Sequence, residues 1–247
     1  MIKTRLAIIA LLAIAASAWA DARAMDILKK ADVVMLPANA EFKWSMTVKK
    51  SGEDDRIDRF LCWKKGDLKY LFFHVWPEPN YGQAMIRVDS TIWHYLPLAD
   101  EVIKESYRSA FLDSDLSFAD VMYNELSVYY DASFIDESSG ETLTLELKAK
   151  PGATGYARIV VTIDRNTLAT LKREYYSKTG QLLKVIAFSD LQYSGQRLSA
   201  MRLLVTQPML KGQSTIAEFS DIRDKSDVKE QYFSLNYVKA FKPKASD

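Results

Sequence analysis

The feature that most constrains this chain is an alternation of apolar and polar residues that returns several times along it. Segment 41–49 shows it most clearly, since its apolar residues include Phe42, Trp44, Met46 and Val48. Successive side chains of a strand point to opposite faces of a sheet, so this spacing predicts a strand with one buried face. The same period occurs in segments 126–134, 143–149 and 159–163. These segments indicate a protein built mainly on β-strands.

Less regular apolar segments extend the predicted sheet. Turn signals that contain glycine separate several of them, among them Lys65-Gly66-Asp67, Pro151-Gly152 and Lys178-Thr179-Gly180. Short turns of this kind join antiparallel neighbours. We therefore expect about 11 sequential strands, mostly as an antiparallel meander. The additional segments are 56–64, 67–76, 82–88, 91–96, 170–177, 181–189, 198–206 and 212–221.

Helical patterns are few. Residues 24–36 have helical spacing and end before Pro37, and residues 111–124 form a second candidate that Ser114 or Ser117 could cap. A further short turn is expected near 227–231. A sheet with one apolar face must cover that face, either by closing or with helices. The sequence therefore predicts an incompletely closed antiparallel β-barrel, with short helices forming a plug or lid over an apolar hollow.

The N-terminus has the pattern of a secretory signal. Lys3 and Arg5 precede an apolar run, and Ala18-Trp19-Ala20 supplies a small-x-small cleavage site. The apolar run, residues 6–16, is shorter than the roughly 20 residues of a membrane-spanning helix. We expect residues 1–20 to be removed and residues 21–247 to form a single domain. No cysteine lies near the cleavage site, so attachment of a lipid anchor there is not expected.

The composition argues against several functions. The chain has 33 Lys and Arg against 32 Asp and Glu, which does not suggest nucleic-acid binding. The single cysteine, Cys62, cannot form an internal disulfide, and its apolar neighbours favour a buried, inert thiol. Neither histidine, His74 or His94, has a second ligand at metal spacing, and the common hydrolase and nucleotide motifs are missing. We expect neither a cofactor nor an enzyme.

Three motifs resemble the outer-membrane lipoprotein-sorting, LolA-like superfamily of Gram-negative bacteria. They are Gly82-Gln83-Ala84-Met85-Ile86-Arg87-Val88, then Ile92-Trp93-His94-Tyr95-Leu96-Pro97, and the segment 111–121. At Asp113 the family has glycine, so the turn there is a point of difference. The resemblance implies an unclosed antiparallel barrel whose helical lid covers a cavity for lipid or lipidated protein in the periplasm. A carrier must also release its cargo, and our hypothesis is that segment 111–124 is the lid that moves to allow this.

Two functional hypotheses remain open. The first is a periplasmic carrier that binds a lipid, or the acyl chains of a lipoprotein, for transport towards the outer membrane. The alternative is a non-catalytic accessory module of an RND-type envelope lipid transporter, with an inner-membrane protein as partner. Neither hypothesis involves nucleic acid or a membrane-spanning segment. Core packing is the commoner role for any single aromatic residue, but as a set we expect the cavity to be lined by Phe42, Trp44, Met46, Ile86, Trp93, Phe111 and Phe118.

Overall fold

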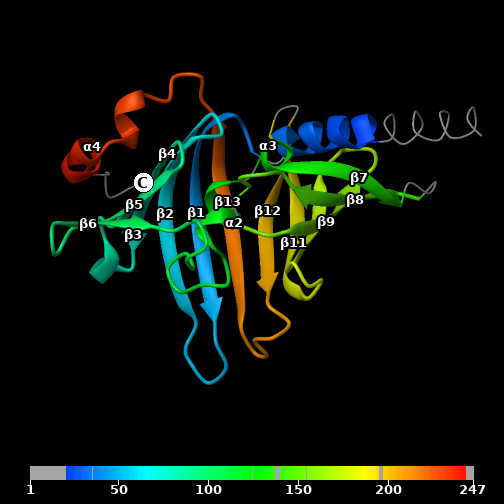
Figure 1. Cartoon of the computed structure of the whole chain (residues 1–247). Coiled ribbons are helices and arrows are strands. Elements are labelled where there is room, and N and C mark those ends of the chain that lie inside the picture. Colours follow the sequence, from blue (N-terminus) through cyan, green and yellow to red (C-terminus); the bar gives the residue numbers. More distant parts are fainter. Residues whose placement is uncertain are drawn as a thin grey trace, which may run out of the picture.

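The computed structural model describes residues 21–34, 36–123, 125–136, 140–153, 155–194 and 197–242. The expected signal peptide, residues 1–20, lies outside these described residues. The described chain forms one sheet of 13 strands (Figure 1). In chain order the strands are β1 (Asn39–Lys49), β2 (Arg56–Lys65), β3 (Lys69–Trp76), β4 (Ala84–Val88), β5 (Thr91–Leu96), β6 (Glu101–Glu105), β7 (Tyr130–Asp136), β8 (Thr142–Ala149), β9 (Arg158–Asp164), β10 (Thr170–Tyr176), β11 (Leu182–Ser194), β12 (Arg197–Thr206) and β13 (Ser214–Asp224).

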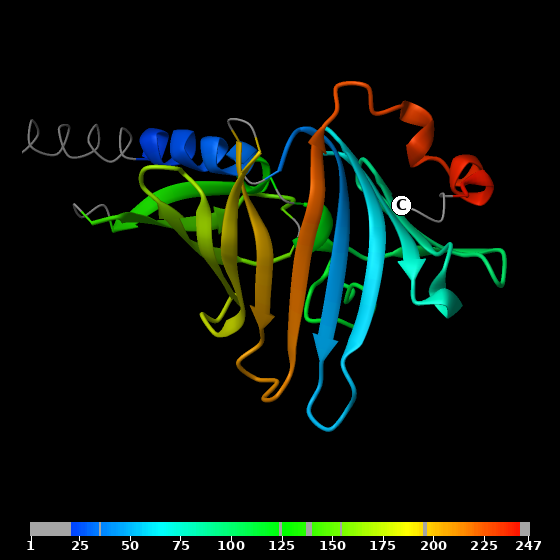
Figure 2. The same cartoon turned by 180° about the vertical axis from the view of Figure 1, so that it is seen from behind.

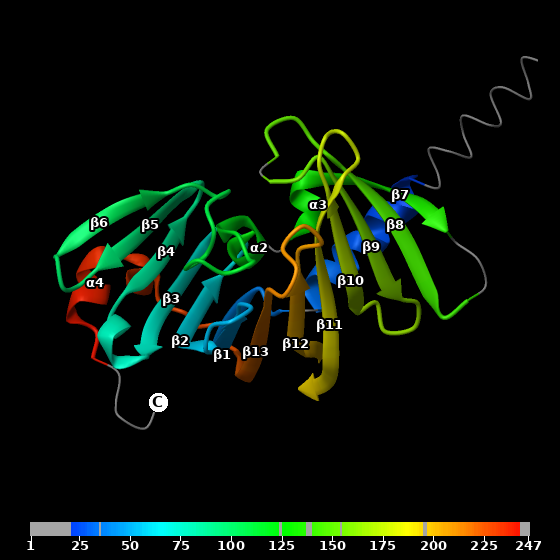
Figure 3. The same cartoon turned by 90° about the horizontal axis from the view of Figure 1, so that it is seen from below.

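The strand order makes the sheet an open barrel. It runs β6-β5-β4-β3-β2-β1-β13-β12-β11-β10-β9-β8-β7, and all of its pairs are antiparallel. The central pair joins β1 to β13, while the two edges, β6 and β7, are consecutive in sequence. The chain from 106 to 129 therefore connects one edge to the other. Figure 3 shows this connection, with α2 (Phe118–Met122), inside the curve of the sheet. The predicted incompletely closed barrel is confirmed.

The alternation of β1 directs its apolar side chains to the concave face. Phe42, Trp44 and Met46 are buried there, whereas the residues between them are partly exposed. Trp44 is paired in register with Phe60 of β2 and Phe219 of β13. Its ring centroid lies 5.2 Å from that of Phe60 and 6.3 Å from that of Phe219. Aromatic pairs at these separations stabilise packing beyond the area that they bury.

Two groups of short helices cover different faces of the sheet. Residues 21–34 are helical and, with α2 and α3 (Leu126–Tyr129), contribute to the core on the concave face. On the other face, η2 (Glu230–Phe233) and α4 (Leu235–Ala240) cover β2 to β5, forming a second cluster with Trp63 and Phe73. Figure 3 shows α4 on the opposite side of these strands from α2, and Figure 2 shows the long central strands from behind. A short η1 (Glu78–Asn80) follows β3.

Four local features differ from what the sequence predicts. Segment 126–134 was predicted as one strand, but its first four residues form α3, because the carboxylate of Asp32 accepts the N–H groups of Leu126 and Ser127 at 3.1 and 2.8 Å. Strand β6 was missed because its residues are mostly exposed and do not alternate. The predicted turn near 227–231 is followed by α4, a helix that had no clear pattern of its own. Of residues 111–124, only α2 is helical, and Ser117 caps it.

Two glycines in hairpin turns differ in how closely a neighbouring hairpin approaches them. Gly180 and Gly212 both have positive φ, at 82° and 77°. A Cβ added to Gly212 would lie 2.9 Å from Cβ of Ser51, whereas a Cβ added to Gly180 would meet nothing within 4 Å. We predict that Gly180→Ala lowers the free energy of unfolding by about 1–2 kcal/mol. Gly212→Ala should cost about 1–3 kcal/mol more because the β12–β13 turn must move. Urea unfolding measures the free energy of unfolding of both variants. An equal loss of stability in the two would contradict the close approach of Ser51 to Gly212.

Candidate functional site

A cavity lies between the concave face of the sheet and the chain that crosses it. Its empty volume is about 870 Å³, with the solvent at its mouth included. Side chains from β1, β2, β3 and from β10 to β13 form its wall, and Leu116 and Val121 form its roof. A concave site with mainly apolar and aromatic walls and a few polar groups is typical of sites for apolar ligands. The apolar and aromatic lining is Leu36, Phe42, Trp44, Tyr70, Phe72, Leu116, Val121, Ile186, Phe188, Ala200, Leu203, Phe219 and Ile222.

The roof belongs to a segment, residues 106–123, that we call the lid. Its tight turn places Leu112 and Asp113 at φ 48° and 53°. Aspartate tolerates this left-handed region better than most residues, which explains how Asp113 replaces the glycine of the resembled family. The lid then folds back on itself, since Phe111 N–H donates to the carbonyl of Leu116 at 2.7 Å. The side chains of Ser117 and Asp120 form a capping box at the start of α2.

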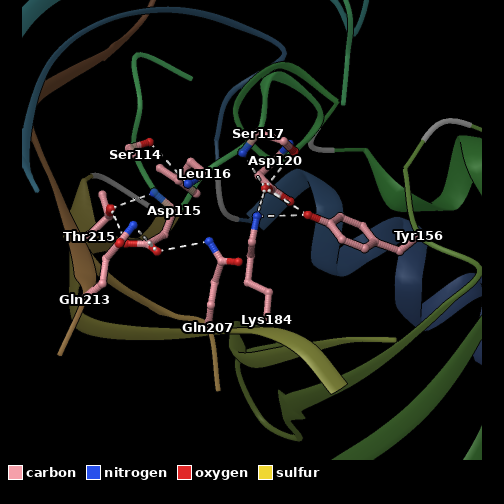
Figure 4. Close-up of polar contacts among 10 residues, drawn as sticks. All are labelled: Ser114, Asp115, Leu116, Ser117, Asp120, Tyr156, Lys184, Gln207, Gln213 and Thr215. Atoms are coloured by element: carbon pink, nitrogen blue, oxygen red, sulfur yellow. Dashed lines mark hydrogen bonds and ion pairs between the residues drawn. The ribbon is translucent and has the colours of Figure 1, made fainter. Parts of the chain in front are cut away.

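Asp115 fixes the lid to the β12–β13 hairpin. Its carboxylate is buried and accepts hydrogen bonds from Thr215 Oγ1 at 2.8 Å and from Gln213 Nε2 at 3.0 Å. Gln207 Nε2 donates to the same carboxylate at 3.0 Å (Figure 4). The backbone N–H of Asp115 donates in turn to Thr215 Oγ1 at 3.0 Å. These bonds connect the lid to residues about a hundred positions away in the sequence.

Asp120 fixes the lid to the far half of the sheet. Its Oδ2 accepts from Lys184 Nζ at 2.6 Å and from Tyr156 Oη at 3.2 Å, as Figure 4 shows. Both charged side chains of this ion pair are almost completely buried, at 1% exposure for Asp120 and 7% for Lys184. Burial, and then the charge of Asp120, raise the pKa of Tyr156, so its hydroxyl stays a proton donor.

Arg87 fixes the C-terminal end of the lid. Its guanidinium donates to the carbonyl of Met122 and, at 2.9 Å, to the carbonyl of Asp67. It also lies 3.6 Å from the ring centroid of Tyr123. Arg87 is fully buried, and its positive charge is balanced by carbonyl dipoles and an aromatic face. The lid is thus held by directional polar contacts at three points.

Charged side chains lie at one end of the otherwise apolar cavity. Lys64 Nζ pairs with Glu125 at 3.1 Å, and Asp32 accepts the two N–H groups at the start of α3. Burial raises the pKa of Asp32 above its ordinary value. Arg173 is also buried, at 6% exposure, and its Nε has no hydrogen-bond partner among the residues that the structure describes.

The histidines and the cysteine lie in packed surroundings. His74 Nε2 is 3.0 Å from a carboxylate oxygen of Asp58, and its ring stacks on Phe60 at 4.5 Å. His94 Nε2 is 3.1 Å from the amide oxygen of Gln83, and burial lowers its pKa. Cys62 is buried, which raises its pKa well above the ordinary value and makes it unreactive. Within the described part of the chain, no group of three or more potential ligands could hold a metal ion.

The structure separates the residues predicted to line the cavity into three sets. Phe42 and Trp44 line it directly. Met46, Phe111 and Phe118 are buried in the same concave core but lie outside its lining. Ile86 and Trp93 belong to the cluster on the opposite face. The residues that sequence reasoning missed include Phe72, Leu203, Phe219 and the charged Arg173.

The comparisons with known proteins agree on the fold. A protein-family model with the description "Uncharacterized protein" matches residues 66–240. A LolA superfamily protein from Nitrosomonas europaea is 19% identical, with a TM-score of 0.78 over 87% of this chain and 98% of its own. A DUF1329 family protein from Desulfovibrio piger is 22% identical, with a TM-score of 0.79 over 89% of this chain and 99% of its own.

A third solved structure has a functional name. It is a putative outer membrane lipoprotein-sorting protein domain from Vibrio parahaemolyticus, 22% identical, with a TM-score of 0.75 over 89% of this chain and 99% of its own. No curated protein sequence matches this chain. The three structures confirm the resemblance found in the sequence at the level of the fold.

The ion pair below the lid yields a prediction. Lys184→Met leaves the buried carboxylate of Asp120 without its cation and should lower the free energy of unfolding by about 3–5 kcal/mol. Lys172→Met is the matched control, since its ion pair with Glu174 is 43% exposed on the lysine side and should change stability by less than about 1 kcal/mol. Hydrogen exchange should speed up in residues 109–122 for the first variant alone. Unchanged exchange there would show that Asp120 does not fix the lid.

Proposed function

We propose a function from the premise that this chain belongs to the family whose model matches residues 66–240 and that it has the fold of LolA superfamily proteins. The protein is a periplasmic carrier that encloses the acyl chains of a lipid or a lipoprotein in the cavity below its lid. It carries them through water towards the outer membrane. It acts by binding and release and needs no catalytic group.

The observation that carries this proposal is the cavity with apolar and aromatic walls under a lid held in place by polar contacts. Transfer of a methylene group from water to such a site is favourable by about 0.8 kcal/mol. An acyl chain of ordinary length therefore gains enough from burial to be held without any charged contact. The aromatic rings of Phe42, Trp44 and Phe72 suit chains of varied shape, because they offer flat, apolar walls.

Release is the step that the lid controls. A cargo that is buried on all sides leaves only when part of its cover moves. The lid is short, and its contacts to Lys184, Thr215 and Arg87 come from three separate strands. Polar contacts of this kind are either made or broken, so they suit a cover with two positions.

Two observations support the location and the partners. The signal pattern of residues 1–20 favours export, and one structural neighbour is named as a putative outer membrane lipoprotein-sorting domain. Among the described residues, no helix has both the length and the apolar character needed to cross a membrane. The partners proposed are a lipid or lipidated protein as cargo and an inner-membrane protein as its donor.

Leu203 and Leu204 provide a matched test on one strand. Leu203 lines the cavity, whereas its neighbour Leu204 in β12 is 42% exposed on the other side. We predict that native mass spectrometry of protein purified without detergent detects bound phospholipid or acylated peptide. Leu203→Asp should reduce this occupancy at least tenfold because it places a charge in the apolar wall. Leu204→Asp should leave it unchanged.

The other outcomes decide between the two hypotheses. An equal loss of bound lipid in both variants would point to unfolding, which circular dichroism and urea unfolding of each variant would detect. A mass without ligand, and no uptake of added lipid, would overturn the carrier. It would favour the accessory module of an envelope transporter, in which the outer surface of the barrel binds the partner.

A further inference from the structure

Arg173 occupies an unusual position in the cavity wall. Its neighbours in register are Val161 of β9 and Ile186 of β11, and both belong to the core of the concave face. The side chain therefore points to the inside of the barrel, where it is 6% exposed. Its guanidinium lies over the ring of Phe188, 5.1 Å from the centroid. A guanidinium keeps its positive charge at all physiological pH values.

This arginine lines two adjoining cavities of different character. The first is the apolar cavity described above, and the second has an empty volume of about 310 Å³. Arg173 and Asp120 line both of them, so the two cavities meet at these residues. The second cavity is rich in tyrosine, with Tyr123, Tyr129, Tyr130, Tyr156 and Tyr175 in its wall. Burial raises the pKa of Tyr130 to about 12, so this phenol adds no negative charge to the site.

The negative charges nearby are already engaged. Asp120 is paired with Lys184, as Figure 4 shows, and Glu125 is paired with Lys64. Asp32 lies close enough for Arg173 to influence its pKa, but its two oxygens accept backbone N–H groups of α3. No ion pair to Arg173 within 4.0 Å is present in the part of the chain that the structure describes.

The unpartnered polar atoms in this wall are mostly donors. Nε of Arg173 and the indole Nε1 of Trp44 are both buried without a hydrogen-bond partner among the described residues. Oδ1 of Asp120 is the unpartnered acceptor, but its carboxylate is held through Oδ2. A buried donor without an acceptor costs free energy, and a charged one costs more. A ligand that brings anionic oxygens to this point would remove that cost.

We propose that Arg173 binds the anionic head of the acyl cargo, a carboxylate or a phosphate group, at the junction of the apolar and the tyrosine-rich cavity. The acyl chains then extend into the apolar cavity, along Phe188, Leu203 and Phe219. The inference rests on the proposed function and narrows its cargo to amphiphiles with a negative charge next to the acyl chains. An uncharged lipid would fill the same space and would offer neutral ester oxygens, but it would leave the positive charge of the guanidinium without an anionic partner.

The test compares three ligands and three variants. The ligands are oleate, dioleoylphosphatidylglycerol and the uncharged dioleoylglycerol, and their affinities are measured by titration in native mass spectrometry. Arg173→Met should lower the affinity for the two anionic lipids at least tenfold, because a charge-assisted hydrogen bond is lost. The same substitution should change the affinity for dioleoylglycerol by no more than about twofold. Arg173→Lys should retain part of the affinity. Arg158→Met, which removes an arginine of β9 that is paired with Glu146 of β8, should leave the affinities unchanged.

A second measurement separates binding from stability. Replacing a buried, unpaired charge by an apolar side chain of similar length leaves stability unchanged or raises it. Urea unfolding of Arg173→Met should therefore show no loss relative to the wild-type protein. A marked loss, together with weaker binding of all three lipids, would show that Arg173 is a structural residue and would overturn the proposal.

The remaining outcomes also decide. If oleate alone depends on Arg173, the head is a carboxylate, and if the phosphatidyl lipid alone depends on it, the head is a phosphate. Inorganic phosphate is titrated as a further ligand, and if its binding alone depends on Arg173, the assignment to a lipid head is overturned. If the protein binds all three lipids and Arg173→Met alters none, the carrier stands and this inference fails. If it binds no lipid, the proposed function itself fails.

Discussion

The apolar concave face of the sheet must be kept from water, and the rest of the structure depends on how this is done. The sheet does not close on itself, since β6 and β7 remain its edges. Because these strands follow one another in sequence, the chain between them connects the two edges, and it does so across the concave face. Among the described residues of that crossing, the helices are the short α2 and α3, five and four residues long. So thin a cover leaves space beneath it, and the cavity follows directly from the topology.

A cover made largely of turns brings polar backbone groups into the interior, where each needs a partner. The lid meets this need with side chains of its own. Asp120 caps the helix that it belongs to and also pairs with Lys184. Asp115 accepts three side-chain hydrogen bonds from the β12–β13 hairpin. Apolar packing alone is not directional, so these buried carboxylates determine where the lid lies on the sheet.

The strands with one apolar face could be predicted from the sequence, because local alternation is enough to identify them. The predicted segment 41–49 lies within β1, Asn39–Lys49. The two strands β3 and β4 are buried on both faces, however, and such strands lose the alternation that identifies the inner side chains. Met85 faces the concave core, and its neighbour Ile86 faces the other cluster, although both are fully buried. The sequence therefore identified the strand but not which of its faces was the inner one.

Other features depended on contacts between distant residues. Residues 126–129 became helical because Asp32 accepts their N–H groups, and helix α4 packs on the outer cluster around Trp63. The lid could be identified from its motif, but its partners could not. Lys184 lies 64 positions from Asp120, and Thr215 lies 100 positions from Asp115. No local pattern connects such pairs. The same holds for the cavity, whose wall combines residues from the beginning, the middle and the end of the chain.

The buried cations show why Arg173 is informative. Three other buried cations have acceptors from the chain. Arg87 donates to carbonyl oxygens, Lys64 to carbonyl oxygens and Glu125, and Lys184 to Asp120. The fold is thus able to satisfy a buried positive charge. Arg173 differs because its Nε is without an acceptor in the described structure, and because it lines the cavity. A wall that served only to hold hydrocarbon would be more favourable with an apolar side chain at this position. The guanidinium is best explained by an anionic group on the cargo.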